Sequence, residues 1–404
     1  MTAAALLTAL LISAVAACTS PLDCGLNGLC VDTVCACDSP WAGPSCTSLP
    51  FKVSPASGKN LYLTSDPRNT WNGPITRAAD GTFHIFTPLY ATGSLGRVLT
   101  TLHGVATSVT GPYDWASQPA LNLTSINPAL VVYPSAAGEN VFSLWLGGRV
   151  LAASSPYGPF DAVRNFTYPG QNPAPIYFKG AFYMTNQFTT TIWTTPSVAP
   201  GSTWAVFSTI SHAQANYPPY DYHVEDPCAS RACHCLSRMP LPPPARDGAP
   251  SRGAPPAATA TLTTPNARLP TPSLTPQPAV MWIDKRGNWH IVNHAYSNIQ
   301  YMNCSSSDVS AHFFSPDGIT WAYSQQPYGT FVEYDDGTSH SYVTLERPNL
   351  HFDAGGVLTH INLAADLITQ GEGCPTRTDH AHNGHGPCND CKWSDHAGTT
   401  IVAL

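Results

Sequence analysis

The sequence predicts an all-β protein, a five-bladed β-propeller with a small disulfide-rich module at its N-terminus. Three observations predict this fold. Five segments each place a short polar element ending in proline directly before a β-hairpin, the prolines recur at a spacing that suits propeller blades, and six cysteines gather between residues 18 and 46. We expect the module to span residues 17–48 and the propeller to span residues 55–404.

The five polar elements mark the starts of five hairpins. Each hairpin alternates apolar and polar residues around a turn that contains glycine, as antiparallel strands require. Proline suits the first residue of such a strand, because no hydrogen bond of the sheet is lost there. The elements are Asn72-Gly73-Pro74, Asn127-Pro128, Asn172-Pro173, Glu225-Asp226-Pro227 and Glu346-Arg347-Pro348.

The spacing of the prolines supports a repeat architecture. Pro74, Pro128, Pro173 and Pro227 lie 54, 45 and 54 residues apart, and such periods are typical of four-stranded propeller blades. The innermost strands of a propeller converge on its axis, so we expect the polar elements to gather around one central pocket. The closing residues 399–404 are expected to fasten the last blade to the first.

The fourth unit is interrupted by residues 228–279, which are rich in proline, alanine, threonine and arginine. Such a composition cannot form a packed core. Without this segment, Pro227 would lead straight into the hairpin that begins at Val280, as in the other units. We interpret the segment as a translated intron or an error in the gene model. The alternative is a genuine disordered loop, in which Cys233-His234-Cys235 could hold a metal ion.

The composition is typical of a β-rich protein of the secretory pathway. Only 11% of the residues are charged, and the net charge of −7 comes without a lysine or arginine cluster, which argues against nucleic acid as a partner. Residues 1–16 resemble a signal peptide that ends in the cleavage site Ala14-Val15-Ala16, with a retained anchor as the alternative. We therefore expect a secreted monomer with no integral membrane span after cleavage. Sequons for glycosylation occur at Asn122, Asn165 and Asn303.

The six N-terminal cysteines predict a module that disulfides hold together, because so short a segment cannot bury enough core to fold alone. Counting alone leaves 15 pairings open. The spacing, with a C-x-C and a Trp41-Ala42-Gly43 turn in the last loop, resembles an EGF-like module. Zinc binding is disfavoured, since no histidine accompanies these cysteines. The resemblance implies disulfides between Cys18 and Cys30, Cys24 and Cys35, and Cys37 and Cys46.

The repeated units also resemble a known superfamily, the five-bladed propeller glycoside hydrolases, which include the family 43 arabinanases and xylosidases and the family 32 invertases. The likeness is greatest to a secreted branch of that superfamily and covers about residues 60–370. The motifs that carry it are N-P at 127–128, N-P-A-P at 172–175, E-D-P at 225–227 continued by residues 280–290, and E-R-P-x-L-x-F-D at 346–353.

The resemblance implies an axial pocket that accepts carbohydrate and hydrolyses a glycosidic bond. Such hydrolysis needs two carboxyl groups, one on each side of the scissile bond. The superfamily places carboxylates at its first three blade starts, where this sequence has Asn72, Asn127 and Asn172. The catalytic candidates are therefore Glu225 and Glu346, in the fourth and fifth units. The alternative is a pocket that binds glycan without cutting it, because an amide cannot transfer a proton.

Further residues are candidates for positioning the sugar. The histidines among them are expected to end or enter inner strands and to line the pocket. An inter-blade ion pair of Glu346 with Arg347, and turn capping by Glu225 and Asp226, are the structural alternatives. No cofactor and no metal ion are expected, and the later cysteines Cys304, Cys374, Cys388 and Cys391 are expected to form disulfides. The substrate-binding candidates are Asn72, Asn127, Asn172, Asp226, Arg347, His103, His294 and His312.

Overall fold

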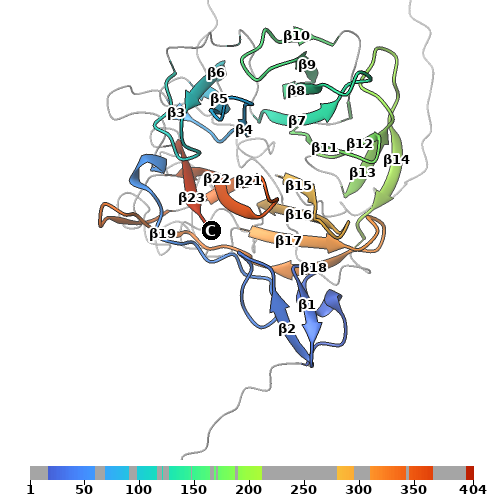
Figure 1. The fold of residues 1–404 in the computed structure, drawn as a ribbon, viewed down its shortest axis with the longest axis vertical. Helices are drawn as coiled ribbons and strands as arrows, with labels where there is room; N and C mark the ends of the chain where they lie inside the picture. Colours follow the sequence, from blue (N-terminus) through green and yellow to red (C-terminus); the bar gives the residue numbers. More distant parts are fainter. Residues whose placement is uncertain are drawn as a thin grey trace, which may run out of the picture.

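The computed structural model describes a propeller and a cysteine-rich module attached to one side of it (Figure 1). The expected signal peptide, the interruption at 228–279, the sequons and the later cysteines all lie outside the described residues. No helix within the described part is long and apolar enough to cross a membrane. The described residues are 17–59, 69–90, 98–115, 121, 127–146, 148–163, 168–169, 172–186, 190–211, 280–294, 310–342, 345–366 and 397–404.

The chain is a five-bladed β-propeller, as the sequence predicts. Each of the five predicted hairpins forms the two innermost strands of one blade. Going round the axis, the innermost strands contact one another in the order β7, β11, β15, β21, β4. The innermost strands are β4 (Ile75–Arg77), β7 (Ala129–Pro134), β11 (Ala174–Phe178), β15 (Val280–Ile283) and β21 (Leu345–Phe352). Their hairpin partners are β5 (Phe83–Tyr90), β8 (Asn140–Leu146), β12 (Ala181–Thr185), β16 (Trp289–His294) and β22 (Leu358–Asp366).

The second, third and fourth blades are four-stranded antiparallel sheets in simple up-and-down order. Strand β8 of the second blade and strand β17 of the fourth, Ser310–Ser315, are buried on both faces, because neighbouring blades cover them. Polar residues in these strands therefore need partners within the protein. The outer strands are β9 (Arg149–Ala153) and β10 (Asp161–Ala162), β13 (Thr191–Thr195) and β14 (Ala205–Thr209), and β17 (Ser310–Ser315) and β18 (Ala322–Gln325).

The inner edge of the first blade is broken in the middle. Strand β3 (Asn69–Thr70) and strand β4 both pair with β5, one at each end of it, and the gap between them holds the polar element Asn72-Gly73-Pro74. A side chain at Gly73 would meet the carbonyl oxygen of Phe86 at 2.0 Å, so this close approach requires glycine. The third strand is β6 (Val98–Ala106).

The fifth blade is completed by the C-terminus of the chain. Strand β23 (Ala397–Ala403) pairs with β22 as the third strand of this blade, so its backbone pairing stays within the last blade. The side chain of Thr399 in this strand makes one of the links to the first blade. Its hydroxyl oxygen accepts a hydrogen bond from the backbone N–H of Asn72 at 2.9 Å and lies 2.9 Å from the hydroxyl of Thr70.

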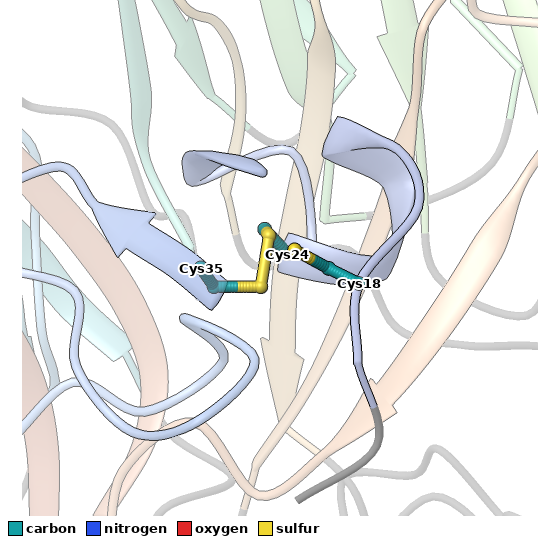
Figure 2. A group of neighbouring side chains, drawn as sticks. All are labelled: Cys18, Cys24 and Cys35. Atoms are coloured by element: carbon teal, nitrogen blue, oxygen red, sulfur yellow. A yellow bond between two sulfur atoms is a disulfide. The ribbon is translucent and has the colours of Figure 1, made fainter. Parts of the chain in front are cut away.

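The N-terminal module contains a short hairpin, β1 (Gly28–Val31) and β2 (Val34–Cys37), and the 3₁₀ turn η1 (Pro21–Cys24). The sulfur atoms of Cys18, Cys24 and Cys35 lie within 4.8 Å of one another (Figure 2). All three are in disulfides, which leaves no thiolate to bind a metal ion. The three disulfides join Cys18 to Cys30, Cys24 to Cys35 and Cys37 to Cys46, which is the pairing that the EGF-like resemblance implies.

The module packs against the fourth and fifth blades. Trp41 and Leu49 are buried in one apolar cluster with Val292 of β16 and Leu345 of β21. The segment that follows the module then runs along the fifth blade and into the turn η2 (Ala56–Gly58). In this segment the backbone N–H of Lys52 donates a hydrogen bond to the carbonyl oxygen of Ala403 at 3.0 Å. The same segment also contacts the outlying hairpin β19 (Phe331–Glu333) and β20 (Ser339–Ser341) through Ser54.

We predict that replacing Thr399 with valine, which keeps the shape but removes the hydroxyl, lowers the free energy of unfolding by about 1–3 kcal/mol, because it leaves the buried N–H of Asn72 without its acceptor. Urea denaturation of the purified protein measures the effect. The matched control is Thr209→Val, since Thr209 is exposed on the outer strand β14. Equal stability of the two variants would contradict a ring-closing role for Thr399.

Candidate functional site

The axis of the propeller contains a cavity of about 390 Å³ that all five innermost strands line. Most of its lining side chains are apolar, and Tyr177, Asp284 and Asn349 supply polar groups. The innermost strands of a propeller run in one direction along the axis, so the five strand starts meet at one end of the cavity. Asn72, Asn127, Asn172 and Glu346 all precede or begin an innermost strand and therefore belong to that end.

Asn72 lies at the junction between the first and last blades, where it is buried, with 5% of its surface exposed. Its side-chain amide donates to the carbonyl oxygen of Arg347. Its side-chain oxygen accepts hydrogen bonds from the N–H of Gly73 and, at 2.9 Å, from the amide of Asn349. The Asn72 side chain is thus bonded to both blades, and its contacts are those of a structural link.

Glu346 and Arg347 begin strand β21 and are both buried, with 1% and 6% of their surfaces exposed. Burial raises the pKa of the Tyr328 hydroxyl, and the nearby carboxylate of Glu346 raises it further. Tyr328 therefore stays protonated beside Glu346 at every ordinary pH. Its hydroxyl lies 3.5 Å from the carbonyl oxygen of Leu345. Glu346 is the one described carboxylate at the start of an innermost strand.

Asn172 and Arg347 share an unusual backbone conformation with Asn72. The φ angles of the three residues are 49°, 52° and 58°, in the left-handed region that residues other than glycine rarely adopt. Asn172 and Arg347 lie directly before the proline of a blade start, and Asn72 lies two residues before it. Asn127 and Asn172 are half-buried, unlike Asn72. The polar element is therefore a repeated local structure of the first, third and fifth blades, and asparagine suits it because its short side chain tolerates this conformation.

Some of the predicted site residues lie outside the described part of the chain. Glu225 and Asp226 are not among the described residues, and of His294 only the strand position, at the end of β16, is described. The catalytic hypothesis depends on the distance between Glu225 and Glu346, and this pairing therefore stays a prediction.

His103 and His312 are not on inner strands, so that expectation is wrong. They lie on β6 and β17, the third strands of the first and fourth blades, where both are buried. Each forms a hydrogen bond with a histidine of the second strand: His103 with His84 at 2.9 Å, and His312 with His290 at 3.0 Å. Neither His103 nor His312 is among the residues that line the axial cavity.

The two histidine pairs occupy the same register of their blades. Within the sheets, His103 lies opposite Phe86 and His312 lies opposite Val292, in each case two residues beyond the partner histidine. Burial lowers the pKa of His103 to about 3, with the neighbouring His84 adding to the effect. Burial also lowers the pKa of His312. The signal that could have revealed the pairs is the repeated His-Ile dipeptide at 84–85 and 290–291, each just after an aromatic residue.

No protein-family model matches this chain, and no curated protein matches it. Among solved structures, the chain is similar to an endo-arabinase from Bacteroides thetaiotaomicron, with 10% identity, a TM-score of 0.41, and coverage of 88% of this chain and 97% of that one. It is also similar to an α-L-arabinofuranosidase from Fusarium graminearum, with 9% identity, a TM-score of 0.42, and coverage of 88% and 96%. A third is an α-L-arabinofuranosidase from Lactobacillus brevis, with 7% identity, a TM-score of 0.40, and coverage of 83% and 91%. Because these identities and TM-scores are low, we assign the five-bladed fold from the order of the strands in this chain's own sheets.

The buried histidines predict that the protein loses stability in mild acid. A histidine in the unfolded chain takes up a proton below about pH 6.5, whereas burial keeps His103 in the folded protein neutral down to about pH 3. The contribution of His103 to the free energy of unfolding is therefore complete above about pH 6.5 and decreases as the pH falls. Between pH 7.5 and pH 5, His103 alone should account for a loss of about 2 kcal/mol.

Urea unfolding at both pH values, in the natural sequence and in His103→Gln, measures this contribution. The variant should show the smaller loss between the two pH values, whatever its absolute stability. Val206→Ala, at an exposed position of β14, serves as the control and should follow the natural sequence. A His103→Gln variant with an unchanged pH dependence would show that His103 is charged in the folded protein.

Proposed function

We propose that this chain is a secreted, carbohydrate-active protein of the glycoside-hydrolase type, which holds a glycan at the end of the propeller axis where the innermost strands begin. The observation that carries the proposal is the axial cavity lined by all five innermost strands, with the buried carboxyl group of Glu346 at the start of one of them. Concave sites of this kind, with a few polar groups among apolar ones, are the usual place for small ligands. The three disulfides support the extracellular location.

In this proposal Glu346 is one of the two carboxyl groups that glycoside hydrolysis requires, and Glu225 is the other. Glu346 is buried beside the protonated Tyr328, in a setting where electrostatic interactions are stronger than in water. Arg347, Asn127 and Asn172 are at the same end of the axis and are proposed to position the sugar by hydrogen bonding. The separation of the two carboxyl groups would decide between retention and inversion of configuration at the sugar.

Non-catalytic glycan binding is the second candidate, and the contacts of Asn72 favour it. The Asn72 amide donates a hydrogen bond to the carbonyl of Arg347, which an ionised carboxylate at that position could not do. The first blade start is thus suited to joining blades and offers no acid or base. A protein with amides at three blade starts would bind a sugar through the same cavity and leave its linkages intact.

Measurements of hydrolysis of a panel of aryl glycosides and plant and microbial glycans test the proposal. We expect Glu346→Gln and Glu225→Gln each to lower turnover by about 10²–10⁴-fold, the usual contribution of an acid or base group. The matched control is Glu333→Gln, because Glu333 is exposed on the outlying strand β19. The full-length protein and a form without residues 228–279 are both assayed, so that the effect of the interruption is measured separately.

Circular dichroism and thermal unfolding would show that each variant is folded. Hydrolysis that is lost in both glutamine variants and kept in Glu333→Gln supports a hydrolase. Glycan binding without turnover, unaffected by either glutamine, would instead identify a lectin-like propeller and end the catalytic assignment.

A further inference from the structure

A second cavity, of about 680 Å³, lies between the N-terminal module and the propeller. The module contributes Asn27, Asp38, Ser39 and Trp41 to its wall. The propeller contributes the turn ends of the inner hairpins of the fourth and fifth blades, from Trp282 to Arg286 and around Phe352. This cavity, the module cleft, therefore exists only because the module is docked on these two blades.

The module cleft lies at the opposite end of the axis from the blade starts. Ile283 and Phe352, which line it, are the last residues of β15 and β21, whereas the candidate site lies where these strands begin. Trp282, Ile283, Asp284 and Phe352 line both the module cleft and the axial cavity, so the two cavities adjoin at these side chains. A ligand in the module cleft would thus lie at the far mouth of the axial cavity.

Two tryptophans of the module cleft are held in place by the buried histidine pair of the fourth blade. The indole of Trp282 stacks on the ring of His290, with centroids 4.8 Å apart and planes 13° apart. The indole of Trp41 stacks on His312 at 4.8 Å. Since His290 and His312 are themselves hydrogen-bonded, both indoles have a fixed orientation before any ligand arrives. The histidine pair of the first blade differs at the equivalent position, because Thr76 lies opposite His84 where Trp282 lies opposite His290. The stacking of Trp282 on a histidine is therefore specific to the pair beside the module.

The charged groups of the module cleft balance one another. Asp38 and Asp284 supply two negative charges, and Lys285 and Arg286 supply two positive ones. Arg286 pairs with Asp38 at 2.5 Å and with Asp284 at 3.4 Å, and it donates to the carbonyl of Leu26 at 2.6 Å. Burial raises the pKa of Asp284, but the ring of His290, whose Nε2 lies 3.5 Å from the carboxylate, and hydrogen bonds from Asn288 outweigh it and lower the pKa to about 2. The cleft is therefore polar and carries little net charge.

We propose that the module cleft is a second carbohydrate-binding site, for an uncharged oligosaccharide. A sugar ring has apolar C–H faces that pack on aromatic rings and a rim of hydroxyl groups that form hydrogen bonds, and the cleft combines both kinds of wall. Trp282, the more exposed of the two tryptophans, would pack on a sugar face, and the buried Trp41 would form part of the wall beside it. Asp38, Asp284 and Arg286 would bind hydroxyl groups. The site uses neither Glu225 nor Glu346, so it goes beyond the function proposed for the axis and does not depend on it.

Calorimetric titration of the full-length protein with cellohexaose, xylohexaose, arabinohexaose and laminarihexaose tests this proposal. The main variant is Ser39→Trp, which fills the cleft from an exposed position without removing any contact of the fold. Trp282→Ala, which removes one stacking surface, is the second variant. The control is Val206→Trp, which adds the same bulk to an exposed site on β14. We expect both cleft variants to weaken binding of at least one oligosaccharide tenfold or more, and the control to leave it unchanged.

The outcomes separate this inference from the function proposed for the axis. Binding that Ser39→Trp abolishes, in a protein that hydrolyses none of the sugars, supports the cleft and removes the catalytic proposal. Hydrolysis that depends on Glu346, together with binding that neither cleft variant changes, overturns the cleft and keeps the catalytic proposal. Trigalacturonate, a charged oligosaccharide, should bind the cleft more weakly than the neutral ones. Tighter binding of trigalacturonate, or no binding of any neutral hexaose, also overturns the inference.

Discussion

The structure depends on one junction, between the first and last blades, because a propeller is stable only when its ring is closed. Four of the five contacts between blades follow from the order of the chain, whereas the fifth must join its two ends. Here the junction is built from buried polar groups: the hydroxyl of Thr399 accepts from the backbone of Asn72, whose side chain bonds to Arg347 and Asn349. These hydrogen bonds form only when the strands of the two blades are correctly aligned, because a shifted strand would leave several buried polar groups without partners. Through Thr399, the C-terminal strand β23 thus joins the last blade to the first.

This junction also bears on where chemistry can occur. Because the Asn72 side chain is used to join the blades, the first blade start has an amide that donates to a carbonyl, and the described acidic group at the blade starts is Glu346 of the last blade. The module also packs on the fourth and fifth blades, and the histidine pair that supports its tryptophan lies in the fourth. The buried carboxyl group and the contacts of the module therefore lie on the side of the ring that the fourth and fifth blades form.

The fold could be predicted from the sequence because its signals are local. A proline-ended polar element and a glycine turn specify each hairpin without reference to distant residues, and the five hairpins appear where they are predicted. The site could be predicted only in part. His103 was expected near the axis but lies on a third strand, because strand order depends on pairing between residues about 20 apart and on loops that carry no hairpin signal. The role of Asn72 in the ring junction depends on Thr399 and Arg347, which lie at the other end of the chain.

The docking of the module was beyond sequence reasoning for the same reason. Nothing near Trp41 indicates that its ring stacks on His312, nor does the sequence around Arg286 indicate an ion pair with Asp38. Yet these contacts attach the module itself to the propeller, and the hydrogen bond from Lys52 to Ala403 attaches the segment that follows the module. A module held in this way forms part of the propeller surface, since its position relative to the fourth and fifth blades is set by packing and hydrogen bonds. Its disulfides stabilise the module itself, and the propeller contacts then place its side chains at the far mouth of the axial cavity.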